Sequence, residues 1–150
     1  MKAFIDTNIF IKFLTDAESN KIEQVIASGE ACTSFAVLNE LKFKLLYKEA
    51  SKHINSEKKY EVIKEIKRNT EIRRKVYSFY SNFYKTLRNS VKILGYDEKN
   101  ESISIKLSEF YGLLPTDSSI LACMLTNGYK TILTTDSDFE KIKGIKVIKP

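Results

Sequence analysis

The sequence is poor in the residues that most often carry nucleophilic or zinc-dependent chemistry. It has two cysteines, one histidine and no tryptophan among 150 residues. Cys32 and Cys123 lie in apolar runs without a CxxC spacing, which predicts buried thiols that act as small hydrophobic residues. His53 lies in a lysine-rich stretch, where a solvated surface position is expected. A catalytic triad or a histidine-ligated zinc would have to use that one residue, so any chemistry must come mainly from carboxylates.

Proline and glycine are also scarce, and no linker, repeat or low-complexity tract divides the chain. We therefore expect residues 1–150 to form a single domain. The longest apolar runs are far shorter than the ~20 residues that a membrane span needs. The apolar start at residues 3–5 is interrupted at once by Asp6, so we expect no signal peptide and a cytoplasmic protein.

The net charge of +6 is concentrated in the middle of the chain. Residues 41–92 hold fifteen Lys and Arg against five Glu, a net charge of +10, whereas residues 1–40 carry −3 and residues 93–150 carry −1. Such a positive segment is typical of proteins that bind a polyanion, most often a nucleic acid. A solvated helical face, or the lysine-rich composition of some thermophile proteins, explains the same pattern without a ligand.

Short apolar segments alternate with longer helical patterns. The predicted strands are residues 2–5, 31–33, 91–94, 131–134 and 147–148. Helices are predicted to begin at Thr7, at Ser19 and after the N-cap Ser34. A further helical region covers residues 57–89, with a break near Asn69. Another helix covers residues 98–111, with an apolar face of Ile103, Ile105, Leu107 and Phe110, and the last begins at the N-cap Thr116. This alternation predicts an α/β fold of three layers, α/β/α, with a central, mostly parallel sheet and a helical insertion in the middle of the chain.

Carboxylates follow the ends of the predicted strands. Asp6 comes directly after the first strand, and Asp136 follows the fourth, with Asp138 two residues later. Asp117 opens a helix, and Glu40 is a polar residue in the helix after the second strand. Ligands of parallel sheets bind at the carboxyl ends of the strands, so we expect these acids to converge. A hard divalent cation with oxygen ligands, Mg²⁺ or Mn²⁺, relieves the resulting repulsion.

Taken singly, the same acids have structural alternatives. Asp6 and Asn8 could cap the first helix, and Asp117 could stabilise a helix N-terminus. Asp136 and Asp138 could be turn residues. It is the combination of acids at several strand ends that favours a shared metal site.

Four segments together resemble a known family. They are Phe4–Phe10, Ser34–Leu41, Leu113–Ala122 and Ile132–Phe139. In their order and spacing they resemble the PIN-domain family of metal-dependent nucleases, and within it the VapC-like toxins of prokaryotic toxin–antitoxin pairs. The resemblance covers essentially the whole chain. It implies a PIN-like fold and hydrolysis of RNA phosphodiester bonds with Mg²⁺ or Mn²⁺.

The resemblance also implies site residues and partners. It places the metal ligands and catalytic acids at Asp6, Glu40, Asp117 and Asp136, with Asp138 as an additional ligand and with Asn8 and Thr134 as orienting residues. It implies a homodimer, an RNA substrate and a cognate antitoxin protein. A housekeeping RNA-processing nuclease and a non-catalytic RNA-binding module remain alternatives to the toxin.

Two other classes with an acid after the first strand fit less well. Haloacid-dehalogenase-type phosphatases need Asp-x-Asp, where this chain has Asp6 and Asn8. Receiver domains need a second acid beside the first, and Asp6 has none.

The middle of the chain departs from the shortest VapC-like sequences. Residues 50–92 are longer and more basic, and we expect this basic segment to contact the phosphate backbone of RNA. The aromatic residues between Tyr77 and Tyr84 recur at helical spacing. That spacing favours a core or a subunit interface, in a homodimer, over base stacking.

Overall fold

A computed structural model describes residues 1–15 and 20–150 of the chain. The contacts within the chain define two compact units, Met1–Leu38 with Arg88–Pro150 and Asn39–Leu87. The expected helix start at Ser19 lies outside the described residues. Among the described helices, none combines the length and the apolar composition that crossing a membrane requires.

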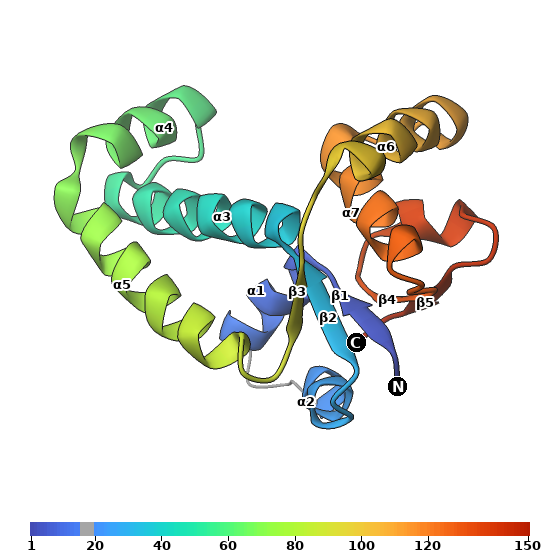
Figure 1. Cartoon of the computed structure of the whole chain (residues 1–150). Coiled ribbons are helices and arrows are strands. Elements are labelled where there is room, and N and C mark those ends of the chain that lie inside the picture. Colours follow the sequence, from blue (N-terminus) through green and yellow to red (C-terminus); the bar gives the residue numbers. More distant parts are fainter. Residues whose placement is uncertain (16–19) are drawn as a thin grey trace. The chain divides into compact units, whose positions relative to one another are not determined.

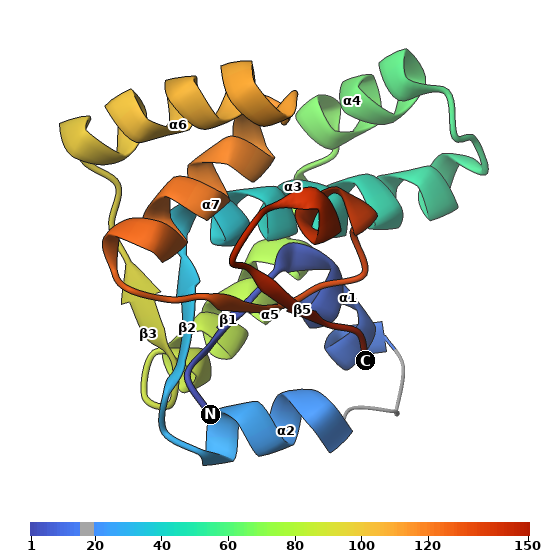
Figure 2. The ribbon, with the colours of Figure 1, turned by 90° about the vertical axis from the view of Figure 1, so that its right-hand side faces the viewer.

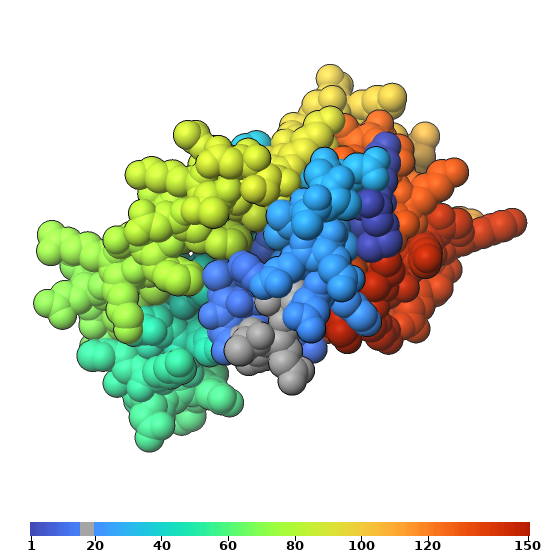
Figure 3. All heavy atoms as spheres, turned by 90° about the horizontal axis from the view of Figure 1, so that it is seen from below, coloured from blue at the N-terminus to red at the C-terminus, as the bar shows by residue number. Residues whose placement is uncertain are grey.

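The first unit is built around a parallel sheet with the strand order β3-β2-β1-β4-β5. The strands are β1 (Ala3–Ile5), β2 (Ala31–Ser34), β3 (Lys92–Leu94), β4 (Thr131–Leu133) and β5 (Lys146–Ile148). In Figure 3 the dark blue N-terminal residues lie between the light blue α2–β2 segment and the orange and red C-terminal part, as expected for a central β1. All five predicted strands are confirmed, each to within one residue at its ends.

Helices flank this sheet on both sides. They are α1 (Thr7–Thr15), α2 (Asn20–Ala27), α6 (Glu98–Tyr111), α7 (Pro115–Thr126) and the short 3₁₀ helix η1 (Ser137–Lys141). Figures 1 and 2 show α1 on one face of the sheet and α7 on the other. The three-layer α/β/α fold with a parallel sheet is therefore confirmed.

The centre of the sheet is fully buried. Phe4, Ile5 and Leu133 have no exposed surface, as expected for short strands that are covered on both faces. The two cysteines are free and buried, as predicted. Burial raises the pKa of Cys32 to about 12 and that of Cys123 to about 11, so both thiols stay protonated at neutral pH. Neither is an activated nucleophile.

The start of α7 differs from the prediction. The helix begins at Pro115, and the N-cap residue is Leu114, which makes no side-chain hydrogen bond, so the expected cap at Thr116 is wrong. Proline is favoured at the first helical position because its fixed φ suits a helix and its missing N–H has no partner there anyway. The hydroxyls of Ser118 and Ser119 instead donate to the Pro115 carbonyl, at 3.0 and 2.8 Å.

The predicted apolar face of α6 is only partly buried. Ile105 is 58% exposed and Phe110 is 79% exposed, whereas Asn100 and Ser104 are buried. The reason is a polar contact with α7, in which the Asn100 amide donates to the Thr126 hydroxyl at 2.7 Å. A buried polar group is tolerated when it is hydrogen-bonded, so the side of α6 that carries Asn100 can be buried against α7.

The second unit is helical and forms the predicted insertion. Its helices are most of α3 (Phe35–Ile54), which begins after the N-cap Ser34, and all of α4 (Lys59–Arg68) and α5 (Thr70–Leu87). The break between α4 and α5 falls at Asn69, as predicted, and the Asn69 side chain accepts the Ile72 N–H at 3.1 Å. The unit has its own apolar cluster, which consists of Leu46, Ala50, Val62, Ile72 and Val76.

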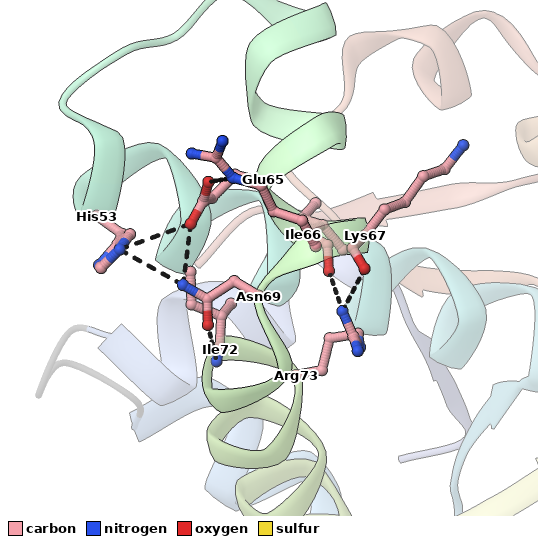
Figure 4. A network of polar contacts seen from close by, with 8 residues as sticks. His53, Glu65, Ile66, Lys67, Asn69, Ile72 and Arg73 are labelled. Atoms are coloured by element: carbon pink, nitrogen blue, oxygen red, sulfur yellow. Dashed lines mark hydrogen bonds and ion pairs between the residues drawn. The ribbon is translucent and has the colours of Figure 1, made fainter.

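A buried carboxylate lies at the centre of a polar network in this unit (Figure 4). Glu65 is 3% exposed and accepts hydrogen bonds from Asn69, at 2.9 Å, and from Arg68. The hydrogen bond from Asn69 is the main reason that the pKa of Glu65 lies below its usual value. His53 lies on the surface, as predicted, and its Nε2 is 3.5 Å from the Glu65 carboxylate. The only histidine therefore serves this structural network.

The aromatic residues of α5 are not core residues. Tyr77 and Phe79 are 46% and 47% exposed. Tyr80 stacks on Tyr84 with ring centroids 6.3 Å apart. The core part of the prediction is wrong, since among the described residues the apolar cluster of this unit includes Ile72 and Val76 but none of the α5 aromatic residues. The subunit interface stays a prediction.

Candidate metal centre

Asp6 lies directly after β1 and is 5% exposed. Its backbone N–H donates to the Leu133 carbonyl, at 3.1 Å, and so continues the pairing between β1 and β4. Its Oδ1 accepts the Thr7 N–H at 2.7 Å, and its Oδ2 accepts the Thr134 hydroxyl at 2.6 Å. A buried carboxylate needs such donors, because burying an ionised group without them costs far more than the roughly 2–7 kcal/mol of a neutral amide or hydroxyl.

Thr134 joins two of the predicted acids. It follows β4 directly and is fully buried. Its hydroxyl donates to Asp6 and accepts the backbone N–H of Asp136 at 3.0 Å. One hydroxyl thereby connects the end of β1 to the loop after β4.

The loop after β4 carries two acids in a defined turn. Asp136 is the N-cap of η1, and its Oδ1 accepts the backbone N–H of Asp138 at 2.8 Å. The next residue, Phe139, is fully buried and anchors η1 to the core. Lys141 lies 3.3 Å from the Asp138 carboxylate, on the outer side of the turn.

Three carboxylates meet at this edge of the sheet. Asp117, Asp136 and Asp138 each offer an oxygen, and these oxygens lie within 4.8 Å of one another. All three residues are partly buried. Asp117 lies in the first turn of α7, where the helix dipole favours a negative charge. A set of ligands made only of carboxylate oxygens suits a hard divalent cation such as Mg²⁺ or Mn²⁺ better than zinc or copper, which favour nitrogen and sulfur ligands.

The other predicted residues are placed as follows. Asp6 is linked to this acidic cluster (Asp117, Asp136 and Asp138) through Thr134. Asn8 is half-buried in the first turn of α1. Glu40 belongs to the second unit, where its carboxylate pairs with Lys44 at 3.0 Å. The roles of all these residues remain predictions.

Sequence reasoning missed two neighbours of the acids. They are the Thr7 N–H, which donates to Asp6, and Lys141, which pairs with Asp138. The spacing of three residues between Asp138 and Lys141 on a helical turn is a signal that could have found the second of these pairs.

Comparison with known proteins identifies the family. The family model of the PIN domain matches residues 3–145, so the chain belongs to the PIN domain family. No curated protein matches the sequence. The resemblance noted in the sequence motifs is therefore confirmed.

Solved structures show the same fold at low sequence identity. A toxin–antitoxin complex from Klebsiella pneumoniae is 17% identical, with a TM-score of 0.61 over 97% of this chain and 95% of that one. VapBC2 from Rickettsia felis, bound to a promoter DNA fragment, is 18% identical, with a TM-score of 0.60 over 99% and 98%. VapBC-5 from Mycobacterium tuberculosis is 16% identical, with a TM-score of 0.57 over the full length of both chains.

The Thr134 hydroxyl gives a prediction about this site. Thr134→Val keeps the shape of the side chain but removes the donor to Asp6 and the acceptor of the Asp136 N–H. We expect a loss of about 1–3 kcal/mol in the free energy of unfolding, and of about 10–100-fold in metal affinity or metal-dependent activity. Denaturant unfolding and metal titration measure the two effects.

Thr134→Ser is the matched control. It keeps the hydroxyl and should restore the metal affinity. Equal metal affinity in the Val and Ser variants would contradict a role for this hydroxyl in positioning the acids.

Proposed function

We propose that this chain is a metal-dependent endoribonuclease and the toxin of a type II toxin–antitoxin pair. The observation that carries the proposal is the approach of Asp117, Asp136 and Asp138 to within 4.8 Å in a PIN-family chain. PIN domains are generally nucleases. The similar solved structures are toxin–antitoxin complexes, which supports the more specific assignment.

The proposed roles follow from position. Asp117 and Asp136 hold the cation, and Asp138 adds a third carboxylate at the outer side. Asp6, fixed by Thr134 and Thr7, contributes negative charge from the buried side. A divalent cation at this place supplies positive charge for the scissile phosphate and makes a water molecule more acidic.

The same proposal includes the partners and the domain organisation. An antitoxin would hold the nuclease inactive, and the active form would be a homodimer, as in the family that the motifs resemble. Because the family model extends over residues 3–145, we propose that both units act together as one PIN domain.

The test is cleavage of labelled RNA by the purified chain, freed of any bound antitoxin. Fragments should form with Mg²⁺ or Mn²⁺ and should disappear when EDTA is added. Binding of RNA without cleavage under any metal would instead identify a non-catalytic RNA-binding module. Cleavage that persists unchanged in EDTA would contradict metal dependence.

A further inference from the structure

The second unit carries a groove along α3 that lies apart from the residues of the acidic cluster. Figure 1 labels this helix. The groove has a volume of about 680 Å³. It is lined by two neighbouring rows of the helix and one loop residue, namely Phe43, Lys44, Tyr47, Lys48, Ser51, Lys52 and Glu57. We call it the α3 groove.

The charge around the α3 groove favours an anionic ligand. Residues 39–87 hold thirteen Lys and Arg against six Glu, a net charge of +7. Within the groove, Lys44 pairs with Glu40, while Lys48 and Lys52 are exposed. In the part of the chain that the structure describes, neither Lys48 nor Lys52 takes part in an ion pair. Their charges are therefore available to a ligand.

The three lysines are regularly spaced. Lys44, Lys48 and Lys52 follow one another at intervals of four residues, which is about 6 Å along a helix axis. This is close to the distance between neighbouring phosphates of one extended nucleic-acid strand. A regular row of cations fits a regular row of phosphates better than it fits the irregular charges of a folded protein surface.

Aromatic rings lie beside the row of lysines. Phe43 is 46% exposed, and its ring centroid is 6.0 Å from that of Tyr47. The Tyr47 hydroxyl donates to the Glu57 carbonyl at 2.9 Å, which fixes the Tyr47 ring at the wall of the groove. Exposed rings next to a cationic track are the arrangement that single-stranded nucleic-acid binding proteins use to stack bases.

We propose that the α3 groove binds single-stranded RNA, with Lys48 and Lys52 on successive phosphates and a base stacked on Phe43. This inference rests on the proposed function, because it treats RNA as the substrate of the same chain. It places base stacking on α3 and leaves the aromatic residues of α5 to the proposed subunit interface.

The experiment measures binding of a short, labelled, single-stranded oligoribonucleotide to the full chain in EDTA over a range of salt concentrations. Lys48→Ala with Lys52→Ala should weaken binding roughly tenfold and reduce the slope of log affinity against log salt by about 1.4, or 0.7 for each lost phosphate contact. Phe43→Ala should weaken binding about 5–150-fold. Thermal melting confirms that each variant is folded.

The matched control is Lys99→Ala with Lys106→Ala, which removes the same charge from exposed positions on α6. This control pair should leave the affinity within about twofold of the wild type. An equal loss in both pairs, or an unchanged salt slope in the α3 pair, would overturn the proposal.

Competitors separate the other occupants. Displacement of the RNA by polyglutamate, with no effect of Phe43→Ala, would identify the groove as a site for an acidic protein. Stronger binding of duplex DNA than of RNA would identify a different nucleic acid as the ligand. Either result overturns the proposal. Binding in the groove without any metal-dependent cleavage leaves this inference standing and removes the proposed function. Metal-dependent cleavage that is unaffected by the α3 variants removes this inference and leaves the proposed function standing.

Discussion

Asp136→Asn is expected to abolish metal-dependent RNA cleavage, with a loss of at least about a hundredfold. Loss of an outer hydrogen-bonding partner of a metal ligand already costs 10–100-fold in affinity or activity, so loss of a ligand should cost more. The amide keeps an oxygen that can accept the Asp138 N–H, so the turn at the start of η1 should survive. Gel analysis of RNA fragments, with circular dichroism to confirm folding, measures the effect.

The matched control is Glu140→Gln, which removes a carboxylate from the same short helix. Glu140 is exposed and pairs with Lys149, outside the acidic cluster. Its loss should leave cleavage within about twofold of the wild type, since exposed ion pairs contribute little. If Asp136→Asn cleaves RNA as fast as Glu140→Gln, the acidic cluster is not the site of catalysis.

Phe139→Ala is expected to lower the free energy of unfolding by about 3–5 kcal/mol, because a fully buried phenyl ring is replaced by a cavity. Phe139 directly follows the acids of the β4 loop and holds η1 against the core. The loss should therefore also loosen Asp136 and Asp138. Denaturant unfolding measures the stability, and metal titration of the folded variant measures the looser site.

The contrasting variant is Phe110→Ala on α6, where the ring is 79% exposed. Its effect on the free energy of unfolding should stay within about 0.5 kcal/mol. Similar losses in the two variants would contradict the difference in burial between the two rings.

The sheet and the insertion could be predicted from the sequence because local patterns decide them. Short apolar runs such as 131–134, alternating with helical patterns, are typical of parallel strands that helices cover on both faces. The break at Asn69 was visible because its side chain competes with the backbone for hydrogen bonds and caps the next helix.

The wrong predictions concern which side of a helix is buried, because that depends on residues far away in the sequence. The buried side of α6 depends on Asn100 meeting Thr126 of α7, a contact that no pattern within residues 98–111 shows. The aromatic residues of α5 had the right spacing for a buried stripe. Among the described residues, the apolar cluster of the second unit nevertheless includes Ile72 and Val76 but none of the aromatic residues between Tyr77 and Tyr84.

The candidate site was partly predictable for the same reasons. The rule that ligands bind at the carboxyl ends of parallel strands led to Asp6 and Asp136. The approach of Asp117 to Asp138 depends on how α7 and η1 pack, so the sequence offered only their residue types. The double role of the Thr134 hydroxyl requires the actual geometry of two strand ends.

The central claim is that these carboxylates hold a divalent cation, and a crystal soaked in Mn²⁺ tests it most directly. The account predicts an anomalous density peak among the oxygens of Asp117, Asp136 and Asp138, about 2–2.5 Å from at least two of them. A map without any peak there, at Mn²⁺ concentrations that occupy other sites on the protein, would contradict it.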